Sequence, residues 1–152
     1  MALGAADDVV GGVANEVAVG AAAGDPLRAG DGWLNDDRAV GLVWALQVPL
    51  VREAAIASCT GSRPQAAEAL WAALARGVPD PEAAEPAALL ALSALLRGDG
   101  GLANVALERA EAAWPGHRFT ATLRGLALAG IRPSELRACL TGARSSCASE
   151  LR

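Results

Sequence analysis

The sequence predicts an all-α protein, a compact bundle of about six to seven helices. Hydrophobic residues make up 53% of its 152 residues but aromatic residues only 3%, so alanine, leucine and valine supply most of the apolar content. Alanine and leucine favour helix strongly. Apolar residues recur every three to four positions, and glycine and proline separate these stretches, a pattern typical of amphipathic helices joined by short turns.

The chain divides into three predicted parts. Residues 1–32 form a poorly determined helical arm that ends in a glycine- and proline-rich linker, because Gly11 and Gly12 each weaken a helix by about 1 kcal/mol relative to alanine. Residues 33–141 form the helical domain. Residues 142–152 are a polar tail.

Start and stop signals place the helices of the domain. A capping box of Ser62 and Gln65 is expected to begin the third helix, and Gly77 in a left-handed conformation to end it. A tight turn from Gly98 to Gly101 surrounds Asp99. The first expected helix is capped by Asn35 or Asp36 and carries Val40, Val43, Trp44 and Leu46. The next ones cover residues 50–59, 63–76, 86–97, 102–113 and 117–129, with a last short helix from Pro133.

One helix stands out as the core of the bundle. Residues 86–97 are apolar almost all round, which indicates a helix covered by neighbours on several sides. Trp44 and Trp71 lie on apolar stripes of other helices, and we expect both indoles to anchor the core. Arg52 and Glu53 are expected to face outward.

Trp33 and Trp114 lie at predicted helix boundaries and could edge a groove. Tryptophan and arginine are enriched at interaction hot spots. Trp114 with Arg109, Arg118 and Arg124 is therefore the candidate partner surface. The alternative for Trp114 is a plug between two helix ends.

Charge and composition exclude several classes of protein. The net charge of -4 argues against a general nucleic-acid or anionic-membrane binder, which concentrates positive charge on one face. No apolar stretch reaches the roughly 18 residues of a membrane span. The amino terminus lacks the basic region of a secretory signal. Three widely spaced cysteines fit reduced thiols, so we expect a soluble, cytoplasmic protein.

The sequence offers no catalytic, cofactor-binding or metal-binding set. His117 is the only histidine, and the chain has no lysine and no tyrosine, so no nucleophile with a base beside it is recognised. A surface or helix-capping role is expected for His117. Its spacing from Cys139 and Cys147 matches no regular zinc motif. The chain is therefore predicted not to be an enzyme.

The segment from residue 86 to residue 115 resembles one tetratricopeptide-type repeat. Two antiparallel helices approach closely only where side chains are small, and a sharp turn between them needs glycine. The small residues in the matching positions are Ala91, Gly98, Ala103, Ala110 and Pro115. Only a weak echo occurs 34 residues upstream, which favours a compact bundle over an extended array of repeats.

Three stretches resemble a known family. They are DDRAVGLVWALQVPLVREAAIASC, ALLALSALLRGDGGLANVALERAEAAWPGHRF and LALAGIRPSELR, and they look like the carboxy-terminal half of the actinobacterial domain of unknown function 4192. The resemblance covers residues 34–140. Members of that family usually carry an α/β portion ahead of this half, so the resemblance implies a truncated or stand-alone version. It brings no established activity.

The leading interpretation is a non-enzymatic helical interaction module that binds a protein segment, or a second copy of itself, between helix pairs. The alternative is the accessory half of a larger enzyme or nucleotide-handling assembly whose α/β domain is absent from this chain. A remnant without a selected function is the third possibility.

Overall fold

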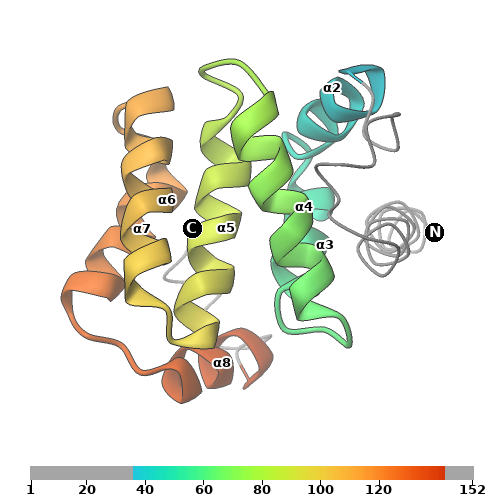
Figure 1. The fold of residues 1–152 in the computed structure, drawn as a ribbon. Helices are drawn as coiled ribbons and strands as arrows, with labels where there is room; N and C mark the ends of the chain where they lie inside the picture. The colour runs from blue at the N-terminus through green and yellow to red at the C-terminus, as the bar shows by residue number, and fades with distance from the viewer. Residues whose placement is uncertain (1–35, 143–152) are drawn as a thin grey trace.

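The computed structural model describes residues 36–142, and all regular secondary structure in this range is helical (Figure 1). The all-α prediction is confirmed. The predicted arm and most of the predicted tail, with Trp33 and Cys147, lie outside the described residues. The helices are α2 (Asp36–Ala45), α3 (Pro49–Ser58), α4 (Pro64–Gly77), α5 (Ala84–Arg97), α6 (Gly100–Ala113), α7 (Arg118–Leu128) and α8 (Pro133–Gly142).

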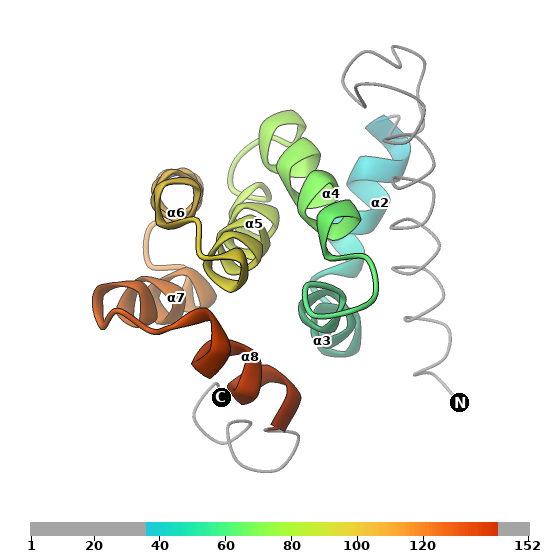
Figure 2. The same cartoon turned by 60° about the horizontal axis from the view of Figure 1, so that its bottom comes forward.

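Helix α5 is the centre of the bundle. It packs against α3, α4, α6, α7 and α8, and Figure 2 shows it surrounded by these neighbours. Every residue from Ala84 to Ala94 is buried, and so is Leu96. The prediction of a core helix is therefore confirmed, and the reason is that α5 is covered on all sides rather than on one stripe.

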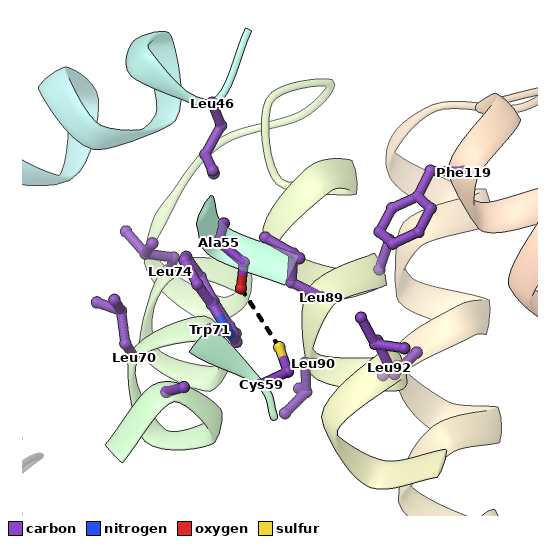
Figure 3. Close-up of a cluster of buried hydrophobic side chains, with 14 of the residues drawn as sticks. Leu46, Ala55, Cys59, Leu70, Trp71, Leu74, Leu89, Leu90, Leu92 and Phe119 are labelled. Atoms are coloured by element: carbon purple, nitrogen blue, oxygen red, sulfur yellow. Dashed lines mark hydrogen bonds between the residues drawn. The ribbon is translucent and has the colours of Figure 1, made fainter. Parts of the chain in front are cut away.

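Leucines and one tryptophan fill the space beside α5 (Figure 3). Trp71 on α4 is fully buried, as its apolar stripe predicts. Leu70 and Leu74 of the same helix and Leu89 and Leu92 of α5 are also fully buried. Each such side chain stabilises the fold by roughly 1.5–3 kcal/mol relative to an exposed one.

Helices α5 and α6 form the antiparallel pair that the sequence predicts (Figure 1). Ala91 of α5 and Ala103 and Ala110 of α6 have almost no exposed surface, and Ala110 packs in one cluster with Ala87 of α5. The likeness of this pair to a tetratricopeptide repeat stays a prediction.

The turn between these two helices is shorter than predicted. Gly98 ends α5 with φ of +80°, a conformation that side-chain-bearing residues rarely adopt. Asp99 then caps α6, because its carboxylate accepts a hydrogen bond from the Leu102 amide at 2.9 Å. Gly100 and Gly101 therefore belong to the first turn of α6 and not to the connection.

Both predicted end signals of α4 are wrong. The capping box of Ser62 and Gln65 does not form, since Arg63 occupies the N-cap position and no side chain caps the helix. Gly77 is the last helical residue, and Val78 follows it in an extended conformation. The reason is that Val78 precedes a proline, which restricts it to extended backbone and ends the helix without a left-handed glycine.

Within residues 36–142, no single helix is both long and apolar enough to cross a membrane. Residues Ala39–Ala45 and Pro49–Ser58 reach the required length and composition only together, as a pair bent by 108°.

Candidate functional site

A pocket of about 180 Å³ lies at one end of the bundle. Because α4, α5, α6 and α7 alternate in direction (Figure 1), the α4–α5 and α6–α7 connections meet at this end, beside α2. We call this site the tryptophan pocket. Its aromatic and polar lining comes from Trp44, Gln47, Glu82, Glu85, Trp114 and His117.

Helix α2 supplies one wall of the tryptophan pocket. Trp44 is 67% exposed, so the prediction that it anchors the core is wrong. Leu42, Val43 and Leu46 are buried instead. Every residue from Ala39 to Ala45 is apolar, so more than one face of this short helix could have been turned inward, and the face with Leu42, Val43 and Leu46 is the one that packs.

The α6–α7 connection supplies the opposite part of the lining. Trp114 follows the last residue of α6 in an extended conformation, and it is 47% exposed. Its ring centroid lies 5.4 Å from that of His117, with the planes tilted by 42°. Gly116, with φ of +81°, reverses the chain so that His117 comes back beside the indole.

Glu85 and His117 form the floor of the pocket, and Arg52, which is not part of the lining, contacts Glu85. Oε2 of Glu85 lies 2.8 Å from Nε2 of His117, and Oε1 lies 2.7 Å from Nε of Arg52. The Arg52 contact lacks the alignment of a hydrogen bond and is an ion pair held by charge. The guanidinium also lies 5.0 Å from the ring centroid of Phe119, within the range of a cation–π contact.

These contacts correct two predictions. Arg52 does not face outward as a free side chain but reaches toward a carboxylate that is only 7% exposed. His117 occupies the N-cap position of α7 without a capping hydrogen bond, and its side chain is 10% exposed. Glu85 is the cause of both, because a buried carboxylate is stable only when charged or polar partners surround it.

The other ring nitrogen of His117 also has a partner. Nδ1 lies 2.8 Å from Oγ1 of Thr120, so a ring whose Nε2–H donates to Glu85 can accept the Thr120 hydroxyl proton. The order carboxylate, imidazole, hydroxyl is that of a nucleophile activated by a base. Thr120, however, is 1% exposed and does not line the pocket, so a substrate there cannot reach its oxygen.

Glu82 gives the pocket an accessible carboxylate. Its side chain is half-buried, and it forms no ion pair or hydrogen bond with any residue in the described part of the chain. Gln47 on α2 is exposed and adds an amide oxygen. Neither residue belongs to a recognisable motif.

The structure divides the candidate partner surface that the sequence suggests. Of its four residues, only Trp114 lines the tryptophan pocket. Arg109 lies 2.7 Å from the Asp80 carboxylate and donates to the Ala75 carbonyl at 3.2 Å.

The other two arginines belong to α7. Arg124 donates two hydrogen bonds to Glu111, at 2.8 and 2.9 Å, and one to Asn104 at 2.7 Å. Its hydrogen bonds and positive charge hold the pKa of the Glu111 carboxyl below its ordinary value of 4.5. Arg118 is exposed at the start of the helix.

The cysteines lie away from the pocket. Cys59 is buried, receives a hydrogen bond from Ser93 at 3.3 Å and donates one to the Ala55 carbonyl (Figure 3). Burial raises the pKa of this thiol, which keeps it protonated. Cys139 is exposed and unpaired. Among residues 36–142, no three histidine, cysteine or acidic side chains are grouped so that they could hold a metal ion.

Comparisons with known proteins give one finding. The model of the domain of unknown function DUF4192 matches residues 4–134, whereas the resemblance seen in the sequence begins only at residue 34. Searches among curated proteins and among solved structures each found no match. The match spans most of the chain, and the chain therefore belongs to the DUF4192 family.

Proposed function

We propose that this protein is a non-enzymatic helical module that binds a segment of a partner protein in the tryptophan pocket. One observation carries the proposal: Trp44 and Trp114 come from separate parts of the chain, line the same pocket and remain largely exposed. Tryptophan is among the residues most enriched at binding hot spots. A third tryptophan, Trp71, is fully buried, so the core is able to accommodate this side chain.

The size of the pocket favours part of a macromolecule over a free small molecule. Pockets for drug-sized ligands have volumes of roughly 300–1,000 Å³, and this pocket has about 180 Å³. It suits one side chain of a docked segment, with the rest of the segment lying across the surface.

The chemistry of the floor supports binding rather than catalysis. Both nitrogens of His117 and both oxygens of Glu85 already have partners within the protein. The one hydroxyl next to the histidine is buried. Because both ring nitrogens of His117 are engaged within the protein, neither is available to take a proton from a ligand or to give one to it.

Site-specific photo-crosslinking in the native cells tests this function. The photoreactive residue p-benzoylphenylalanine replaces Trp44 in one variant and Trp114 in another. A matched control carries it at Leu128, which is 80% exposed and lies at the other end of α7, roughly 15 Å along the helix from its start.

We expect the same partner protein in adducts from positions 44 and 114 and its absence from adducts at position 128. An adduct of the protein with itself would identify the partner as a second copy. A partner with an enzymatic α/β domain would favour the accessory-half alternative. Identical adducts from all three positions, or none from the two pocket positions, would contradict the proposed site.

A further inference from the structure

We infer that the group bound in the tryptophan pocket is an arginine side chain of the partner segment. This inference rests on the proposed function and adds the chemistry of the ligand. It follows from the charge of the lining, from its aromatic side chains and from its volume.

The lining carries an excess of negative charge. Glu82 and Glu85 are its carboxylates, and no arginine belongs to it. The charge of Glu85 is balanced by Arg52 behind it, at 2.7 Å. The charge of Glu82 is balanced by no residue in the described part of the chain. A cation entering from solvent would therefore meet one uncompensated carboxylate.

The two exposed tryptophans of the pocket also favour a positively charged ligand. Tryptophan has the most favourable ring for a cation–π contact, and both Trp44 and Trp114 are open to the pocket. A neutral apolar side chain could contact the same rings, but it would bury Glu82 without a partner. Burial of an unpaired carboxylate is strongly unfavourable.

Arginine fits these groups better than lysine does. Its guanidinium is planar, stacks on aromatic rings and is more weakly hydrated than an ammonium group, so it loses less on leaving water. It carries five N–H donors, which can serve the Glu82 carboxylate and the Gln47 amide oxygen together. A volume near 180 Å³ holds the guanidinium and most of its aliphatic stem.

Nuclear magnetic resonance of the four tryptophan indole N–H groups tests the inference directly. The probe is N-acetyl-arginine methylamide, added to the ¹⁵N-labelled full chain. Phenylalanine variants of Trp44, Trp71 and Trp114 assign the signals. We expect the signals of Trp44 and Trp114 to shift and saturate with a Kd on the order of 1–10 mM, while the signal of buried Trp71 stays in place.

Two neutral or compact analogues provide the chemical controls. The citrulline derivative has nearly the same shape without the charge, and the lysine derivative has the charge without the plane. Both should bind at least about fivefold more weakly than the arginine probe. Equal affinity of either analogue would overturn the assignment to arginine, and so would equal shifts of all indole signals.

Matched variants locate the contacts. Trp44→Ala should weaken binding of the arginine probe about fivefold, and Glu82→Gln about threefold. Glu108→Gln makes the same change in net charge at an exposed position on α6 and should leave the Kd unchanged. An equal loss of affinity in Glu82→Gln and Glu108→Gln would show a general charge effect and would contradict a role for Glu82.

The two proposals fail in different ways. If crosslinking at positions 44 and 114 identifies a partner but the arginine probe binds no better than citrulline, the interaction module stands and the arginine assignment falls. If the probe binds in the pocket but no partner is crosslinked there, the assignment of the ligand stands and the interaction function falls.

Discussion

The interior beside α5 and the tryptophan pocket use the same kind of side chain in opposite ways. In the interior, Trp71 is fully buried among the leucines of α4 and α5 (Figure 3). In the pocket, Trp44 and Trp114 are 67% and 47% exposed. The difference separates a side chain that holds the fold together from two that the fold leaves available for contact.

The polar groups of the two regions differ in the same sense. In the interior, the thiol of Cys59 and the hydroxyl of Ser93 bond to one another, and neither carries a charge. The pocket has a buried carboxylate, Glu85, with a histidine and an arginine as partners. The polar groups of the interior are uncharged and are satisfied by each other. The charged groups of the floor, in contrast, present a polar surface to a ligand in the pocket.

The largest effect should come from truncating the interior tryptophan. Trp71→Ala removes a fully buried side chain and should lower the free energy of unfolding by about 3–5 kcal/mol. Trp44→Ala makes the same chemical change on an exposed position and should stay within about 0.5 kcal/mol of the parent. Urea denaturation followed by circular dichroism measures both, and equal losses would end the distinction between the two regions.

A smaller loss should follow from neutralising the floor of the pocket. In Glu85→Gln, the amide oxygen can still accept from His117, but the amide N–H₂ then faces the donor of Arg52. We expect a loss of about 1–3 kcal/mol in the free energy of unfolding. Glu82→Gln removes a carboxylate from the same pocket that has no described partner, and it should change stability by less than about 0.5 kcal/mol.

The same urea titration decides this second comparison. If the two glutamine variants unfold at the same urea concentration, the contacts of Glu85 with His117 and Arg52 do not stabilise the protein. The charged contacts of the floor would then make no net contribution to the free energy of unfolding.

Much of the fold follows from local sequence patterns, but the pocket does not. Helix α5 is recognisable because a run of residues is apolar on every face, and prolines and glycines mark its neighbours. Helix α2 is apolar on more than one face as well, but it is short and lies at the edge, so periodicity alone could not tell whether Trp44 would face inward.

The contact between Glu85 and His117 joins residues from two different helix ends, and no short motif signals it. The single local hint is that Glu85 is an acidic residue at the head of an almost wholly apolar helix. Such a position implies a buried carboxylate, and a buried carboxylate implies a partner. The lone histidine is one residue able to provide it, alongside thirteen arginines.

The smallest predicted effect concerns an ion pair that lies in neither region. It illustrates that a surface ion pair contributes little to the free energy of unfolding. Arg124 lowers the pKa of Glu111 below 4.5, so this pair stabilises the folded protein fully above the pKa of the unfolded carboxyl. The stabilisation is lost as the pH falls from about 4.5 through the lower folded value. Exposure of Glu111 limits it to about 0.5 kcal/mol.

Glu111→Gln isolates this contribution, because it removes the titrating group and keeps the shape of the side chain. The parent should be more stable than the variant at pH 7, and the difference should shrink as the pH falls below 4.5 through the lowered pKa of Glu111 in the folded protein. Added salt near 1 M should shrink the difference at pH 7, because the pair is exposed to solvent. A difference that persists unchanged in acid and in salt would show that the substitution disturbs packing rather than charge.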